Sequence, residues 1–237
     1  MSGSPLPTVC ILAGGLGTRL GERVAEVPKP LLELAGEPFV LHQLRLLAAH
    51  GATRAVLCVG YRGERIEQRV GAAQFGIELA YSYDAPGLDG TLGAIVRARE
   101  LLGERFLVLY GDTYLRIDYA AVANRWAESG LPALMCVLRN AGRWEASNAE
   151  FDGRLVRRYA KRSPDAGMEW IDYGLGGLTQ AALERRRAGE SDLADLYARL
   201  ASAGELLGVA ASERFYEIGT PGALAEADAF LRAQTLG

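Results

Sequence analysis

The sequence VCILAGGLGTRLGER (residues 9–23) joins an apolar run to a glycine-rich turn, and VPKPLLELAGEPF (residues 27–39) follows it closely. A short apolar run that ends in glycines is typical of a strand at the carboxyl edge of an open α/β sheet, where backbone N–H groups can approach a phosphate. The spacing excludes a P-loop, which requires Gly-Lys-Ser/Thr. It also argues against a dinucleotide fingerprint, which requires a small residue where Leu20 stands.

Similar apolar runs recur along the first half of the chain and alternate with amphipathic stretches. We expect strands in TVCILA, RAVLCVG, IELAYSY and RFLVLYGD (residues 8–13, 54–60, 77–83 and 105–112) and helices near residues 38–50, 63–71 and 91–102. Continuous apolar strands separated by helices are typical of a parallel sheet covered on both faces. The sequence therefore predicts an α/β fold, with one doubly wound, Rossmann-like, mostly parallel (mixed) sheet and helices on both faces.

The second half is less regular and is expected to extend the same sheet. LPALMCVL (131–138) and NAEFDGRLVRRYAK (148–161) are expected to contain strands, with a hairpin turn at residues 152–154. SDLADLYARLASAG (191–204) is expected to be a capped helix that ends at Gly204. Because no internal repeat or linker interrupts the chain, we expect a single domain over residues 1–237.

Composition narrows the classes of function and partner. With 49% hydrophobic residues and a net charge of −3, the 237-residue chain can bury a full core but lacks the basic surface that nucleic acids or anionic membranes require. No run approaches the roughly 18 apolar residues of a membrane span, and the first residues do not have the layout of a signal peptide. We expect a cytoplasmic protein without nucleic-acid or membrane partners.

Two smaller features are expected to be structural. Cys10, Cys58 and Cys136 lie in apolar runs without metal-ligand spacing, so we expect buried, reduced thiols. The basic run Arg185–Arg187 lies in AALERRRAGE (181–190), which we expect to form a helix with a solvated face.

Two cations accompany the glycine turn at fixed distances along the chain. Arg19 follows Gly14, Gly15 and Gly17, and Lys29 lies between two prolines that restrict it. Backbone N–H groups and cations together are suited to a chain of phosphates. The alternative is that the proline-framed segment is only a stiff loop with a solvated lysine.

Residues 12–39, LAGGLGTRLGERVAEVPKPLLELAGEPF, resemble the signature of sugar-1-phosphate nucleotidyltransferases, L-A-G-G-x-G-T-R-L, a spacer, then P-K-P-L-x-x-x-x-G-x-P. The resemblance extends to LDGTLGAIVRA (88–98), FLVLYGDTYLRIDY (106–119) and FYEIGTPGALAEADAFL (215–231). It is closest to short, single-domain members such as heptose-1-phosphate or muramate-1-phosphate nucleotidyltransferases. It implies a cytoplasmic enzyme of nucleotide-sugar biosynthesis that serves carbohydrate or cell-envelope synthesis.

The resemblance implies that a sugar-1-phosphate attacks the α-phosphorus of an NTP in line, with release of pyrophosphate and without a covalent enzyme intermediate. Alignment and charge stabilisation would then supply the catalysis. The implied partners are an NTP and a sugar-1-phosphate. A homo-oligomer is compatible with the resemblance.

The resemblance also implies a role for individual residues. The implied catalytic residues are Arg19, Lys29 and Asp112; the implied nucleotide-binding residues are Leu12, Ala13, Gly14, Gly15, Gly17, Thr18, Gly90 and Thr91. Mg²⁺ is the implied cofactor, with Asp112 and Glu217 as ligands, although the family more often has Asp at the position of Glu217. The alternative for Asp112 is a helix or turn cap.

On the sugar side the implied residues are Asn148, Lys161, Asp172 and Gly174. A carboxylate at position 172, where relatives often have Asn, accepts hydrogen bonds only, so a different pattern of hydroxyls is expected. The alternatives are a solvated lysine at position 161 and turn chemistry at positions 148 and 172. Many pyrimidine-using relatives carry a base-reading glutamine where this chain has Ala85, so the sequence does not identify the base of the NTP.

Two other functions are alternatives to the hypothesis of a sugar-1-phosphate nucleotidyltransferase. One keeps the fold but makes the protein a cytidylyltransferase for a phosphorylated alcohol such as phosphocholine. The other is a catalytically weak sensor that binds nucleotide-sugar, which Glu217 and Ala160 favour because both depart from the family pattern.

Overall fold

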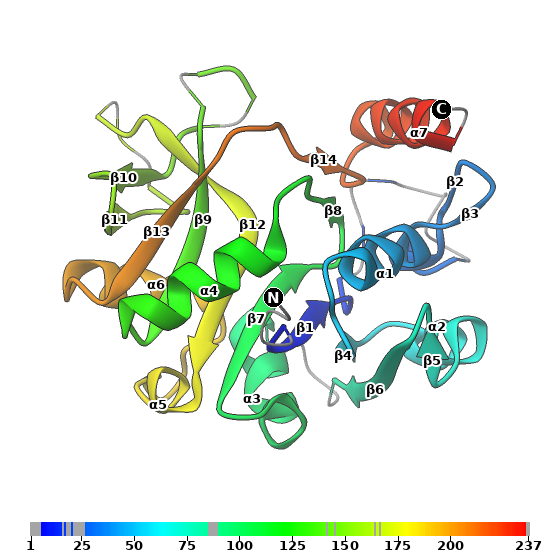
Figure 1. Ribbon diagram of the computed structural model, residues 1–237, viewed down its shortest axis with the longest axis horizontal. Helices are drawn as coiled ribbons and strands as arrows, with labels where there is room; N and C mark the ends of the chain where they lie inside the picture. Colours follow the sequence, from blue (N-terminus) through cyan, green and yellow to red (C-terminus); the bar gives the residue numbers. More distant parts are fainter. Residues whose placement is uncertain are drawn as a thin grey trace.

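The computed structural model is shown in Figure 1. It describes residues 6–15, 17, 20, 27–84, 90–140, 142–144, 146–163, 165 and 167–235. A ten-stranded sheet forms the centre of this described part, in the order β11-β10-β12-β7-β1-β4-β6-β5, with β9 and β13 continuing from β12.

Four parallel strands form the middle of the sheet. They are β7 (Arg105–Tyr110), β1 (Thr8–Leu12), β4 (Arg54–Val59) and β6 (Ile77–Tyr83). Leu12 pairs with Cys58 on one side and with Tyr110 on the other. Their carboxyl ends therefore meet at one edge, and the loops that leave that edge converge there.

The second half of the chain continues the sheet through β12 (Trp170–Thr179), which runs antiparallel to β7. The remaining strands are β5 (Ala73–Gln74), β9 (Ala133–Arg139), β10 (Ala149–Phe151), β11 (Val156–Tyr159) and β13 (Leu206–Ala211). The pairing of β12 with β9 changes register between Asp172 and Gly176. Such a bulge redirects side chains at that point of the strand.

Helices cover both faces of the sheet because neighbouring strand residues point to opposite sides. Val9 and Ile11 of β1 join one apolar cluster, whereas Cys10 joins the other. The first cluster also contains side chains of α1 (Phe39–Ala49), α2 (Gly63–Val70) and α4 (Tyr119–Ser129). The second contains side chains of α3 (Gly90–Leu102), α5 (Gln180–Leu183) and α6 (Leu193–Ser202).

A smaller layer lies beside α1, where Figure 1 shows α7 next to β14 and β2. It contains the 3-10 helix η2 (Lys29–Leu31), the strand pairs β2 (Glu33–Leu34) with β3 (Glu37–Pro38) and β8 (Thr113–Tyr114) with β14 (Tyr216–Glu217), and α7 (Pro221–Thr235). Leu34, Phe39 and Ile218 are fully buried in the apolar cluster of this layer. The layer thereby anchors the segments that carry Lys29 and Glu217.

The structure confirms the predicted α/β fold with a mixed sheet and helices on both faces. The predicted hairpin turn is closed by Asp152, whose Oδ1 accepts hydrogen bonds from the N–H groups of Arg154 and Leu155. The predicted capped helix is α6, where the Asp192 side chain accepts from Ala194 N.

The prediction of a helix through Arg185–Arg187 is wrong. The helix α5 ends at Leu183, and the basic run lies outside any helix. Arg185 pairs with Glu205, and the N–H of Arg187 donates to Glu190. Such contacts can override the helix propensity of a segment.

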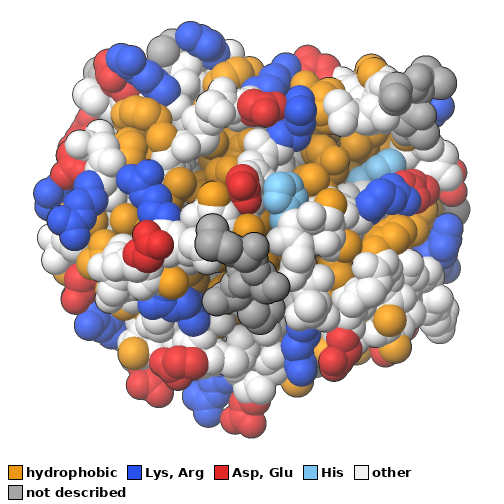
Figure 2. All heavy atoms as spheres, viewed as in Figure 1, with side chains coloured by type: hydrophobic (Ala, Val, Ile, Leu, Met, Phe, Trp, Pro, Cys, Tyr) orange, Lys and Arg blue, Asp and Glu red, His pale blue; other side chains and the backbone are white. Residues whose placement is uncertain are grey.

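The three cysteines are free and buried, as expected. On the face shown in Figure 2, acidic and basic side chains are interspersed. Within the described ranges, every helix falls short of the length and apolar content needed to cross a membrane.

Candidate active site

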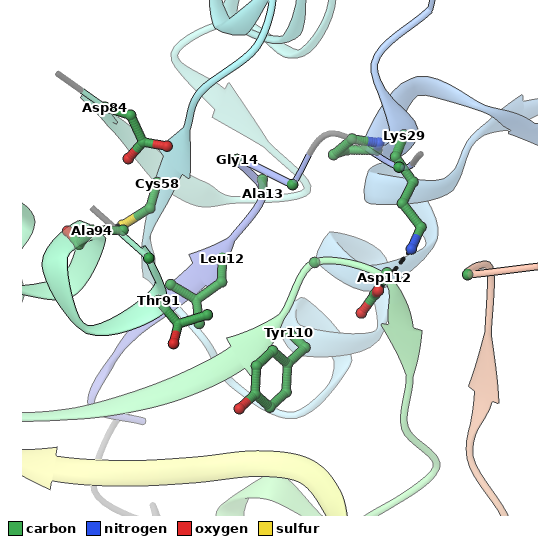
Figure 3. Close-up of a pocket in the computed structure, with 16 residues that line it drawn as sticks. Leu12, Ala13, Gly14, Lys29, Cys58, Asp84, Thr91, Ala94, Tyr110 and Asp112 are labelled. Atoms are coloured by element: carbon green, nitrogen blue, oxygen red, sulfur yellow. Dashed lines mark hydrogen bonds and ion pairs between the residues drawn. The ribbon is translucent and has the colours of Figure 1, made fainter. Parts of the chain in front are cut away.

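A pocket of about 450 Å³ opens at the carboxyl edge of the parallel strands, and Figure 3 shows it. This volume is within the range of small-molecule sites. The described residues that line it are Leu12, Ala13, Gly14, Gly15, Gly17, Lys29, Pro30, Cys58, Asp84, Gly90, Thr91, Ala94, Tyr110, Gly111, Asp112 and Gly219. Nine of the predicted site residues are therefore brought together in one pocket: Leu12, Ala13, Gly14, Gly15, Gly17, Lys29, Gly90, Thr91 and Asp112.

Lys29 and Asp112 form an ion pair at one side of the pocket (Figure 3). The distance from Lys29 Nζ to Asp112 Oδ2 is 2.7 Å. Lys29 is only 8% exposed; η2 begins at this residue, and the flanking prolines restrict its backbone. The alternative of a solvated lysine on a stiff loop is therefore excluded.

Asp112 is held by close packing between backbone segments. Gly111 permits the approach of β7 to β1, since a Cβ at this position would lie 2.5 Å from the carbonyl oxygen of Leu12. The carbonyl of Asp112 accepts a hydrogen bond from Ile218 N at 3.0 Å. The carboxylate contacts Lys29 instead of a helix N-terminus, so the alternative of a cap does not describe it.

The donor set around Asp112 is compatible with Mg²⁺. Its side chain keeps 33% exposure, and only Oδ2 is engaged by Lys29. Within the described ranges, three or more His, Cys, Asp or Glu side chains do not gather into a metal cluster. Mg²⁺ is commonly held by one or two carboxylates together with water and substrate phosphates, so one accessible carboxylate fits it.

Glu217 lies beside the residue that follows Asp112 but is not among the described residues that line the pocket. It pairs with Thr113 in the short β14–β8 ladder, whereas Gly219 reaches the lining. Its role as a second ligand stays a prediction.

The glycine turn after β1 packs closely against the end of β4. Ala13 N donates to Cys58 O at 2.8 Å. A Cβ at Gly14 would lie 3.2 Å from Gly60 N and 2.6 Å from Asp84 Oδ2. Glycine is therefore needed at position 14, because a side chain would displace the neighbouring loop or the Asp84 carboxylate.

Gly90 and Thr91 are fixed against the start of α6. Gly90 has φ +68°, and a Cβ there would lie 2.3 Å from the carbonyl oxygen of Ser191. Thr91 Oγ1 accepts from Leu193 N at 2.9 Å and donates to Asp192 Oδ1 at 3.2 Å. The beginning of α3 is thus tied to the N-terminus of α6.

Asp192 connects the pocket with the predicted sugar side. Lys161 Nζ lies 3.5 Å from Asp192 Oδ1 and 6.0 Å from the centre of the Tyr110 ring, which lines the pocket. Arg162 contacts the other oxygen of Asp192 at 3.3 Å. Burial acts to raise the pKa of Asp192, but the N–H it caps and the neighbouring cations lower it below its ordinary value.

Asn148, Asp172 and Gly174 form a hydrogen-bonded group at the bulge of β12. Asn148 Oδ1 accepts from Asp172 N, and Asp172 Oδ1 accepts from Gly174 N, each at 2.9 Å. Tyr159 Oη donates to Asp172 Oδ2 at 3.0 Å. Burial raises the pKa of Asp172, and these hydrogen bonds together with Lys161 offset part of that rise.

This group lies beside the pocket and is not part of its described lining. Gly174, with φ +95°, approaches Thr113, the residue after Asp112, since a Cβ at Gly174 would lie 3.1 Å from Thr113 Oγ1. The internal hydrogen bonds of Asp172 are those expected of a turn, and sugar binding by this residue stays a prediction. Thr18, Arg19 and Ala85 lie outside the described residues.

Asp84 and Tyr110 line the candidate pocket, and Asp192 contacts Thr91 of the lining, although the sequence indicated none of the three as a candidate. Asp84 immediately follows β6, just as Asp112 follows β7 one residue later. The rule that sites form at the carboxyl ends of parallel strands therefore offered a signal for Asp84. Asp192 was recognisable only as a helix cap, because its contacts with Thr91 and Lys161 join distant parts of the chain.

Comparisons with known proteins show which family this chain belongs to. A family model described as nucleotidyl transferase matches residues 8–144. The mannose-1-phosphate guanylyltransferase catalytic subunit beta of Drosophila pseudoobscura pseudoobscura is 28% identical over 235 residues, which cover 93% of this chain. The chain spans only 63% of the length of that relative.

Two solved structures share the fold. HddC from Yersinia pseudotuberculosis complexed with GMP-PN has a TM-score of 0.77 and 24% identity, covering 95% of this chain and 100% of that chain. A putative glucose-1-phosphate thymidylyltransferase from Bacillus anthracis, in complex with a sucrose, has a TM-score of 0.84 and 19% identity, covering 95% of each chain. At these identities the likeness shows a common fold and no more.

Proposed function

Because the chain belongs to the nucleotidyl transferase family, we propose that it transfers a nucleoside monophosphate from an NTP to a sugar-1-phosphate, giving a nucleotide-sugar and pyrophosphate. The observation that carries this proposal is the buried Lys29 paired with Asp112 in the pocket beside the glycine turn. The sugar-1-phosphate acceptor is supported by the similarity to a mannose-1-phosphate guanylyltransferase.

In the proposed reaction, a phosphate oxygen of the sugar-1-phosphate bonds to the α-phosphorus. The bond from that phosphorus to the bridging oxygen breaks, and the bridging oxygen leaves with pyrophosphate. Lys29 stabilises negative charge on the phosphates, and its restricted backbone limits the entropy lost on binding. Arg19 is proposed to share this role.

The glycine turn supplies the other part of the phosphate site. Gly14 and Gly15 carry no side chain, so their N–H groups can approach the triphosphate closely. Thr91 and Gly90 are proposed to close the nucleoside side of the pocket from the start of α3. Catalysis then depends on alignment and charge, without an enzyme nucleophile.

Asp112 would hold Mg²⁺, with Glu217 as a proposed second ligand. The ion would neutralise charge on the phosphates and make the α-phosphorus more electrophilic. Lys29 would remain within reach of the same phosphates, because it lies beside Asp112.

The acceptor is proposed to bind beside the bulge of β12. Lys161 would meet the sugar phosphate, since it is a cation held near Tyr110 at the pocket rim. Asn148 uses its Oδ1 internally, so its amide hydrogens are the donors left for a sugar hydroxyl. Asp172 and Gly174 are proposed to shape this subsite.

The proposal is tested by a matrix of ATP, GTP, CTP, UTP and dTTP against several sugar-1-phosphates, with Mg²⁺ and with pyrophosphate as the readout. Pyrophosphate release that requires a sugar-1-phosphate supports it. Release with phosphocholine alone would instead identify an enzyme that acts on a phosphorylated alcohol. Nucleotide-sugar binding without release in any combination would indicate a sensor.

A further inference from the structure

Asp84 occupies the side of the pocket opposite the Lys29–Asp112 pair, as Figure 3 shows. The residue directly follows β6, and its N–H donates to Val59 O at 2.8 Å. The backbone of Asp84 therefore continues the ladder between β6 and β4. The side chain of Asp84 therefore starts from a backbone position that is held at the edge of the sheet.

Two glycines make room for this carboxylate. A Cβ at Gly14 or at Gly60 would lie 2.6 Å from Asp84 Oδ2 in either case. Non-bonded carbon and oxygen atoms do not approach so closely, so a side chain at either position would displace the Asp84 carboxylate. The glycine turn thus serves Asp84 as well as the phosphates.

The Asp84 carboxylate has no hydrogen-bond partner within the part of the chain that the structure describes. Burial raises its pKa, and the charge of Arg97 offsets part of that rise. A partly buried carboxylate that lacks donors is unfavourable, and a ligand that supplies donors relieves the cost. The pocket therefore offers two acceptor oxygens at this end.

The position relative to the phosphate site indicates which part of a nucleotide would meet Asp84. If the triphosphate lies at Lys29 and Asp112, the nucleoside extends across the glycine turn toward the opposite side of the pocket, where Asp84 lies. A carboxylate accepts two hydrogen bonds best from two adjacent donors. Guanine presents such a pair, its N1–H and its 2-amino group.

The other bases do not present this pair. Adenine and cytosine place a ring acceptor next to the amino group, and uracil and thymine place one N–H between two carbonyl oxygens. We propose that the Asp84 carboxylate accepts hydrogen bonds from N1–H and the 2-amino group of guanine and thereby selects GTP. This inference rests on the proposed function, since it names the nucleotide used at the same site.

The test measures equilibrium binding by calorimetry, with Mg²⁺ present, for GTP, ITP, XTP, UTP and dTTP. ITP lacks the 2-amino group, and XTP carries a carbonyl oxygen in its place. Wild-type protein is expected to bind GTP about 10- to 100-fold more tightly than ITP and XTP. This comparison needs no variant and is independent of folding.

The substitution Asp84→Asn turns one acceptor into a donor. It is expected to weaken GTP binding by about 10- to 100-fold and to strengthen XTP binding, because the amide can donate to the xanthine carbonyl. Glu78→Gln is the matched control. It changes a carboxylate to an amide on the strand that precedes Asp84, at an exposed position where the carboxylate lies 3.7 Å from Arg54, and it should leave both affinities unchanged.

Each other outcome has a distinct meaning. Equal binding of GTP, ITP and UTP by the wild type would overturn the assignment. An equal loss of affinity for every nucleotide in Asp84→Asn would also overturn it, because the carboxylate would then bind the ribose hydroxyls that all of them share. Pyrophosphate release with a nucleotide other than GTP would overturn it while leaving the proposed function intact. GTP-selective binding without pyrophosphate release would support Asp84 and contradict the proposed function.

Discussion

Lys29 Nζ lies 2.7 Å from Asp112 Oδ2, although 83 positions separate the two residues in the sequence. The contact joins the 3-10 helix after the glycine turn to the end of β7. It places a buried cation and an accessible carboxylate at the same side of the pocket, which is the combination that phosphate transfer with a metal ion requires.

Replacing this lysine is expected to slow the reaction without unfolding the protein. A charge-assisted contact contributes about 1.5–3 kcal/mol, so Lys29→Ala should reduce kcat/KM for pyrophosphate release by about 10- to 100-fold. Arg99→Ala is the control, because the Arg99 side chain is exposed and its contact with Glu100 is long, at 3.7 Å. Release at the wild-type rate by Lys29→Ala would remove Lys29 from the catalytic set.

Chelation of divalent ions is expected to stop pyrophosphate release, and added Mg²⁺ should restore it. Asp112→Asn should lower kcat by about 100-fold or more and raise the Mg²⁺ concentration at half-maximal rate, since one carboxylate ligand is lost. Glu217→Gln, assayed in the same titration, separates the two carboxylates. A shifted Mg²⁺ requirement would make Glu217 a ligand, and an unchanged one would exclude it.

Lys161 and Arg162 are neighbouring cations that share Asp192, which makes them a matched pair. Lys161→Ala should raise KM for the sugar-1-phosphate about tenfold or more, because a phosphate contact is lost, and should leave NTP affinity unchanged. Arg162→Ala, at a 63% exposed side chain, should change neither value appreciably. Equal effects of the two substitutions would show that Lys161 acts only as part of a surface ion-pair network.

The titration of Asp172 is expected to appear in the stability of the protein. Because its pKa is raised in the folded state, the folded form binds this proton more readily than the unfolded form. The contribution to stability is complete below the ordinary pKa near 3.8 and is lost as the pH rises through the raised pKa. The wild type should therefore lose free energy of unfolding relative to Asp172→Asn as the pH increases above 4.

Urea unfolding between pH 4 and 7 measures this difference. Asp152→Asn is the control, since the backbone N–H groups of Leu155 and Arg154 lower the pKa of Asp152 to about 2 and leave it ionised throughout that range. A wild-type advantage that grows with pH would contradict the expectation for Asp172.

Two glycines provide a test of packing that is independent of function. A Cβ at Gly208 would lie 2.3 Å from the Phe151 ring, so Gly208→Ala should destabilise the protein by about 1–3 kcal/mol. Gly222→Ala, in α7, meets no atom within 4 Å and should be neutral or stabilising by up to about 1 kcal/mol. Thermal unfolding of both variants gives the comparison, and similar melting temperatures would contradict it.

The parallel half of the fold was predictable because each of its strands is marked by the residues of the strand itself and of the turn that follows it. A continuous apolar run such as residues 105–110, closed by glycine and an acid, indicates both a buried strand and the site at its carboxyl end. The sequence could thus identify Asp112 as a site residue without knowledge of its neighbours.

The strand β12 was not predicted, since its DYGLGG segment (172–177) has neither apolar alternation nor β-branched residues. It is held extended by pairing with β7 and β9, and Gly177 is required because a Cβ there would meet the Trp126 ring at 2.7 Å. These constraints come from tertiary contacts, which residue order alone does not contain.

The pairing of β8 with β14 and the contacts of Asp192 could not be predicted either, because they also join distant parts of the chain. Asp84 directly precedes Ala85, the position at which many pyrimidine-using relatives carry the base-reading glutamine, and the sequence alone does not bring Asp84 to Gly14. The structure shows Asp84 in the pocket lining, beside Gly14.

The most direct test of the account follows the α-phosphate. The protein is incubated with Mg²⁺, a sugar-1-phosphate and an NTP labelled at the α-phosphorus, and the labelled products are separated and identified by mass. The account predicts that the label is recovered in a nucleotide-sugar, with one pyrophosphate released for each molecule formed. Recovery of the label in free nucleoside monophosphate, or in unreacted NTP with every sugar-1-phosphate, would contradict it.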